Sequence, residues 1–100
     1  MSRYELATRA VADWLEIIRC TRQKWGQAQP QYYREELDLA LQRLSLVPGR
    51  GRSHAAIAVG LRSFQVAQHV AFYIERKDRI TVLRILHPRM NVDEAFEKEE

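Results

Sequence analysis

The sequence has 100 residues, which suffices for one domain that buries roughly 60 to 65% of the surface its unfolded chain exposes. Its hydrophobic share of 46%, charged share of 29% and net charge of +3 are ordinary for a globular protein and exclude an intrinsically disordered chain. No apolar run approaches the roughly 20 residues that span a bilayer, and residues 1–10 lack the apolar segment of a signal peptide. We therefore expect one cytoplasmic domain over residues 1–100, with no membrane contact.

A short strand and a long helix are predicted at the N-terminus. Residues 4–7 suit a first strand, and from about Thr8 the apolar positions recur every three or four residues, as in an amphipathic helix. The apolar face of this helix carries Ala7, Val11, Trp14, Leu15, Ile18 and Trp25. Gly26 then suits the left-handed residue that closes a helix. The single cysteine, Cys20, has no partner for a disulfide, so we expect it to be a buried or half-buried helix residue.

A second helix should begin near Pro30 and end before Pro48. Its apolar positions keep the same period and consist of Tyr33, Leu37, Ala40, Leu41 and Leu44. Because few residues separate the two helices, they must run antiparallel as a hairpin that presents one apolar ridge to the rest of the fold.

The segment from Val47 to Gly60 has neither the helix nor the strand period, and its proline and glycines predict a solvated linker. Arg50 and Arg52 alternate with glycines there, but their spacing matches no phosphate-binding loop. His54 has no His, Cys or carboxylate nearby at ligand spacing. We therefore predict no metal and no cofactor.

Three runs rich in β-branched and aromatic residues follow, at Leu61–Val66, Val70–Glu75 and Ile80–His87. The links between them are too short for a crossover helix, so the runs should form an antiparallel meander. The predicted fold class is α+β, with a short N-terminal strand and an antiparallel helix hairpin packed on an antiparallel sheet that ends in this three-stranded meander.

The last strand is nearly continuous in apolar character, as expected of a central strand covered on both faces, but Arg84 interrupts it. A guanidinium in that setting needs a partner. Either Arg84 forms a structural ion pair or lays its stem along apolar surface, or it serves the function directly.

Charge is unevenly distributed along the second half of the chain. Between Arg50 and Arg89 the only acidic residues are Glu75 and Asp78, against the basic residues Arg50, Arg52, Arg62, Arg76, Lys77, Arg79, Arg84 and Arg89. The segment from Asn91 to Glu100 is acidic and predicts a short terminal helix or a frayed tail. A cationic sheet suits an acidic partner, which is either a protein or a nucleic acid.

The three strands carry a family resemblance in the motifs LRSFQV, HVAFY and ILHPRM. These motifs resemble those of the ParE toxins in the RelE/ParE superfamily, the toxic halves of bacterial toxin–antitoxin pairs. Gln65, Ala71 and Pro88 stand where that family commonly has proline, isoleucine and glutamine. The resemblance extends from about Tyr4 to Asp93, which is nearly the whole chain.

The resemblance implies a toxin of a type II toxin–antitoxin system that inhibits DNA gyrase by binding and performs no reaction of its own. It also implies neutralisation by a ParD-like antitoxin that folds on the toxin, so the protein should form a hetero-oligomer and meet nucleic acid only through the gyrase complex. The expected target-binding residues are Arg62, His69, Arg84, His87 and Arg89. The expected antitoxin-binding residues are Trp14, Leu15, Ile18, Leu37 and Leu41.

Two alternatives stay open. A RelE-like messenger RNA endonuclease acting on the ribosome would use Arg62 and Arg84 to stabilise charge and His87 as acid or base. No carboxylate lies between Gln42 and Gln68, however, so a second proton carrier is missing from the expected face. A plain nucleic-acid-binding module is the other alternative, although the aromatic residues of the sheet form no recognisable base-stacking motif.

Overall fold

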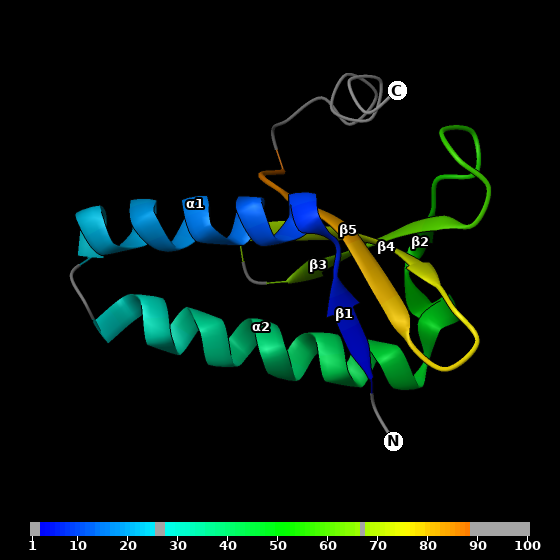
Figure 1. Cartoon of the computed structure of the whole chain (residues 1–100), viewed down its shortest axis with the longest axis horizontal. Helices are drawn as coiled ribbons and strands as arrows, with labels where there is room; N and C mark the ends of the chain where they lie inside the picture. The colour runs from blue at the N-terminus through cyan, green and yellow to red at the C-terminus, as the bar shows by residue number, and fades with distance from the viewer. Residues whose placement is uncertain (1–2, 26–27, 67, 89–100) are drawn as a thin grey trace.

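A computed structural model describes residues 3–25, 28–66 and 68–88, which form two helices beside a five-stranded sheet (Figure 1). The elements in chain order are β1 (Tyr4–Leu6), α1 (Thr8–Trp25), α2 (Ala28–Leu46), the 3-10 turn η1 (Pro48–Arg50), β2 (Arg52–Ser53), β3 (Leu61–Val66), β4 (His69–Glu75) and β5 (Ile80–Leu86). The predicted helices and strands are confirmed within one or two residues at most ends. The predicted closing glycine, Gly26, and the tail from Asn91 to Glu100 lie outside the described residues.

The sheet has the order β1-β5-β4-β3-β2. Strands β3, β4 and β5 pair antiparallel, with Arg62 opposite Tyr73, so the predicted meander is confirmed. The sheet as a whole is mixed, because β1 lies parallel to β5 with Tyr4 opposite Ile80. Six of the seven residues of β5 are buried, as expected of an internal strand.

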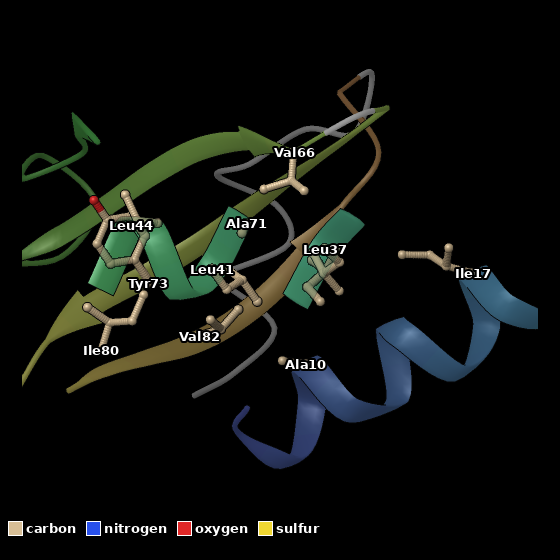
Figure 2. Close-up of a cluster of buried hydrophobic side chains, with 11 residues drawn as sticks. Ala10, Ile17, Leu37, Leu41, Leu44, Val66, Ala71, Tyr73, Ile80 and Val82 are labelled. Atoms are coloured by element: carbon tan, nitrogen blue, oxygen red, sulfur yellow. The ribbon is translucent and has the colours of Figure 1, made fainter. Parts of the chain in front are cut away.

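Both helices pack on one face of the sheet (Figure 1). The buried cluster between helices and sheet contains Ala10, Ile17, Leu37, Leu41, Leu44, Val66, Ala71, Tyr73, Ile80, Val82 and Ile85, most of which Figure 2 labels. Side chains of this cluster recur every three or four residues on α2 and every second residue on β4, which are the periods of the two structures. Each large apolar side chain buried in this way stabilises the fold by about 1.5–3 kcal/mol before conformational entropy is counted.

The opposite face of the sheet carries a smaller apolar cluster. Its buried members are Leu61, Phe72 and Leu86, and Ile57, from the loop after β2, packs against them. The segment predicted as a solvated linker is therefore partly structured, because it contains η1 and β2 and contributes one side chain to this cluster.

One prediction for α1 was wrong. Cys20 is exposed, because the helix turns the position away from the sheet, and its thiol lies 3.8 Å from Glu16 Oε1. Within the described ranges, no helix is long and apolar enough to cross a membrane.

Candidate functional site

Arg84, a predicted target-binding residue, is paired with Asp13 of α1. Its Nε donates to Asp13 Oδ2 at 2.8 Å and its Nη2 donates to Asp13 Oδ1 at 3.1 Å, a two-point contact that suits a guanidinium and a carboxylate. The two side chains are only 9% and 17% exposed. Arg84 therefore forms the structural ion pair that the sequence analysis names as one alternative, and its role in target binding or in a nuclease stays a prediction.

A bulge in β5 explains where Arg84 lies. Tyr73 pairs with Val82 but Phe72 pairs with Arg84, so β5 holds one extra residue at this point. Strand β1 pairs with residues 80–82 of β5 and does not extend to Ile85. There the Asp13 carboxylate accepts a hydrogen bond from the backbone N–H of Ile85 at 2.9 Å. One carboxylate thus replaces a missing strand neighbour and neutralises the buried guanidinium.

Arg62, on β3, holds the chain segment that leads from η1 to β2. Its Nη1 donates to the carbonyl oxygen of Gly51 at 2.9 Å and lies 3.4 Å from that of Gly49. The Tyr73 hydroxyl lies under the same segment, where it donates to the Pro48 carbonyl at 2.6 Å and accepts from Gly51 N–H at 3.0 Å. Burial raises the pKa of the Tyr73 phenol, so the hydroxyl keeps the proton that it donates.

His69 and His87 lie at the other end of the sheet, in a row of rings that reaches both helices. The ring centroids of His87 and His69 are 6.1 Å apart, those of His69 and Tyr33 are 5.5 Å apart, and those of Tyr33 and Trp14 are 5.8 Å apart. The Tyr33 hydroxyl is also hydrogen-bonded to His69 Nδ1. This row ties α1 and α2 to β4 and to the residue after β5, and it brings together two of the predicted target-binding residues.

The pKa of His69 is lowered, first because the ring is half-buried and second because His87 lies beside it. The folded chain therefore takes up a proton at lower pH than the unfolded chain, whose histidines titrate near about 6.5. As the pH falls below that value, the unfolded chain binds more protons than the folded chain, so the free energy of unfolding decreases. This decrease ends once the pH is below the pKa of His69 in the folded chain. Protonated His69 also carries a hydrogen on Nδ1, so the Tyr33 hydroxyl must then accept where it had been able to donate.

We expect the free energy of unfolding to decrease between pH 7.5 and pH 5.5, with a flatter dependence in a His69→Gln variant. Urea unfolding at a series of pH values measures this. A His87→Gln variant removes the second cause of the shift and should give an intermediate slope. Equal slopes for wild type and His69→Gln would contradict the assignment.

The predicted antitoxin-binding residues divide into two groups. On α1, Leu15 is 62% exposed and its neighbour one turn earlier, Val11, is 41% exposed, while Ile18 and Trp14 are half-buried. Leu37 and Leu41 are only 5% and 0% exposed and pack in the core, and their predicted contact with the antitoxin stays a prediction. The predicted antitoxin-binding residues that are accessible thus lie on α1, and we define Val11, Leu15 and Ile18 as the α1 stripe.

Arg50 and His87 lie in different parts of the described fold. Arg50, within the segment that Arg62 holds, lies 5.8 Å from the centre of the Phe64 ring, whereas His87 directly follows β5. Arg89 lies outside the described residues. Among the side chains that the structure describes, no three His, Cys, Asp or Glu residues come together as metal ligands would.

Comparison with known proteins supplies the family. The sequence model described as "ParE toxin of type II toxin-antitoxin system, parDE" matches residues 4–92. The chain belongs to the ParE toxin family. This membership confirms the resemblance in the strand motifs and the prediction of a toxin of a type II toxin–antitoxin system.

Relatives of the ParE family match nearly the whole chain. Toxin ParE1 of Mycobacterium tuberculosis is 39% identical over 93 residues, which cover 92% of this chain and 95% of the relative. Toxin ParE1 of Caulobacter vibrioides is 33% identical over 91 residues, which cover 91% and 94%. A solved structure described as "Chromosomal ParDE TA system from P. aeruginosa" shares the ParE fold, with a TM-score of 0.71 at 18% identity over 87% of this chain and 96% of that one.

Several residues that shape this ParE-family site were missed from the sequence. Asp13 is one of several charged residues in the first helix, and Tyr73 is one of several aromatic residues in the strands, so the sequence pattern distinguishes neither. The sequence indicated that Arg84 needs an acidic partner. It contains 13 acidic residues, however, and its pattern does not show which of them pairs with Arg84. The hydrogen bonds of Tyr73 to Pro48 of η1 and to Gly51 could not be predicted, because neither the helix period nor the strand period shows which distant residues meet.

Proposed function

We propose that this ParE-family toxin inhibits DNA gyrase by binding to it in the cytoplasm, and that a ParD-like antitoxin neutralises it by binding in turn. The observation that carries the proposal is the family match over residues 4–92 together with relatives named as ParE toxins. Gyrase inhibition is the activity that this resemblance implies.

The contacts of the basic residues support binding over catalysis. A ribonuclease of the RelE type needs cations near the scissile phosphate and two proton carriers. Here Arg84 is buried against Asp13 and Arg62 donates to backbone carbonyls, so both guanidiniums hold the fold together. Of Arg62, Arg84 and His87, the three residues that a nuclease would use, His87 is the one that remains to act as an acid or a base.

The α1 stripe is the surface we assign to the antitoxin. Val11, Leu15 and Ile18 follow one another at spacings of four and three, so they share a face of the helix. An amphipathic helix of the partner can cover such a stripe with its own apolar face. The cationic residues of the sheet favour an acidic partner segment.

The purified protein should inhibit DNA supercoiling by gyrase and leave translation by purified ribosomes unchanged. Adding the product of an adjacent reading frame that encodes a short acidic protein should restore supercoiling, because the toxin is then occupied. Supercoiling and messenger RNA integrity are read from agarose and sequencing gels. Messenger RNA cut in the ribosomal A site, with supercoiling untouched, contradicts the proposal and favours a RelE-like nuclease.

A further inference from the structure

The loop between β2 and β3 projects from the sheet as an uncharged apolar tip. We call residues 54–60 the finger; in Figure 1 it stands at the upper right, clear of both helices. Its tip consists of exposed small or apolar residues, among which Val59 is 95% exposed, and no charged residue lies within it. Val59 is more exposed than any other large hydrophobic residue that the structure describes, and with the exposed alanines beside it forms an apolar tip.

The finger has a fixed shape. His54 N–H donates to the Leu61 carbonyl at 2.8 Å, and Leu61 N–H donates to the Ala58 carbonyl at 3.1 Å, which closes the loop on itself. The His54 ring is hydrogen-bonded to Ser63 Oγ at 2.7 Å, and Ile57 packs on the outer face of the sheet. Gly60 has a φ of 83°, a value that side-chain-bearing residues rarely adopt, and this turns the chain into β3. A loop ordered in advance loses little entropy when it binds.

The charge around the finger indicates the partner. In the sequence the finger is flanked by Arg50, Arg52 and Arg62, and no acidic residue lies between Asp38 and Glu75. An apolar tip whose adjoining segments carry arginines and no carboxylate fits an apolar pocket bordered by carboxylates. The tip holds alanines and one valine and no aromatic or long aliphatic side chain, so it suits a shaped protein pocket better than a lipid surface, which favours larger apolar groups.

We propose that the finger inserts Val59 into an apolar pocket with an acidic rim on the protein that this toxin inhibits. The identification of that protein as gyrase rests on the proposed function, but the role of the finger does not. The antitoxin is assigned to the α1 stripe, so the two partners use different parts of the surface.

The test is a Val59→Asp variant, with Leu39→Asp as the matched control. Leu39 is a 49% exposed leucine of α2 that lies in neither proposed surface, so both variants place a carboxylate at an exposed apolar position. Val59→Asp should abolish growth arrest in expressing bacteria and weaken gyrase inhibition by at least about tenfold. It should keep the melting temperature and the binding of the antitoxin. Val59→Ile and Leu39→Asp should both retain growth arrest.

The outcomes separate the two proposals. Lost arrest for Val59→Asp with no gyrase inhibition by the wild type supports the finger and contradicts the gyrase target. Full arrest by Val59→Asp overturns the finger, whatever the target. Loss of antitoxin binding by the same variant, or sedimentation of the wild type with anionic lipid vesicles that Val59→Asp abolishes, also overturns it, because the tip then serves a different partner.

Discussion

Replacing Asp13 by alanine is expected to lower the free energy of unfolding by about 3–5 kcal/mol, which is the usual cost of removing one member of a buried ion pair. The variant leaves Arg84 charged at 9% exposure and leaves the backbone N–H of Ile85 without the carboxylate that accepts from it. Urea unfolding followed by circular dichroism measures the change. The contact joins residues 71 positions apart, so its loss should also reduce the packing of α1 on β5.

Two further variants isolate the charge from the backbone contact. An Asp13→Ala, Arg84→Met double variant removes both charges and should recover part of the loss, although the Ile85 N–H still lacks the Asp13 carboxylate, at a cost of about 1–3 kcal/mol. Glu16→Ala breaks the exposed pair with Arg19 on the same helix and should change the free energy of unfolding much less than Asp13→Ala, because water and salt screen exposed charges. If Asp13→Ala is no worse than Glu16→Ala, the buried pair does not hold the sheet to the helix.

Replacing Gly51 by alanine is expected to cost about 2–4 kcal/mol, because a methyl group at this position has no room. A Cβ there would lie 2.2 Å from the Tyr73 hydroxyl and 2.8 Å from the Ser63 carbonyl oxygen. Tyr73 is fully buried and cannot turn aside, so the segment from Pro48 to Gly51 must lift away from the sheet and lose its hydrogen bonds to Tyr73. The thermal melting temperature and the unfolding free energy both report this change.

Gly49 supplies the matched control. A Cβ at Gly49 meets nothing within 4 Å, so Gly49→Ala should leave stability unchanged or raise it by up to about 1 kcal/mol through the unfolded state. Adding Tyr73→Phe to Gly51→Ala removes the closest clash and should make the combined loss smaller than the sum of the single losses. Strict additivity would mean that the hydroxyl of Tyr73 does not limit the space at Gly51.

Local pattern predicted the parts of the fold that depend on one segment at a time. The spacing of Leu37, Leu41 and Leu44 gave the buried face of α2, and the apolar run of β5 gave its central place in the sheet. The same spacing could not distinguish a residue that faces the core from one that faces a partner protein, because the core and a partner's binding surface are both apolar. Leu37 and Leu41 were therefore assigned to the antitoxin along with Leu15, although only Leu15 is accessible.

Contacts between distant segments escaped prediction for a different reason. The chain showed that Arg84 needed a counterion, but the choice of Asp13 depends on the bulge at Leu83 and on where β1 ends. The finger and the Tyr73 contacts depend likewise on how the segment after α2 meets the sheet. The family resemblance predicted the fold and the toxin class as a whole, whereas individual side-chain roles followed only from the three-dimensional arrangement.

The pairing of β1 with β5 bears on how the toxin is made. Tyr4 through Leu6 leave the ribosome long before Ile80 through Val82, the residues with which they pair. β1 therefore cannot join the sheet of a nascent chain until β5 has emerged, and contacts of such long sequence separation form slowly. A polypeptide that terminates before Ile80 lacks the strand that pairs with β1, so we expect it not to reach the folded, toxic form.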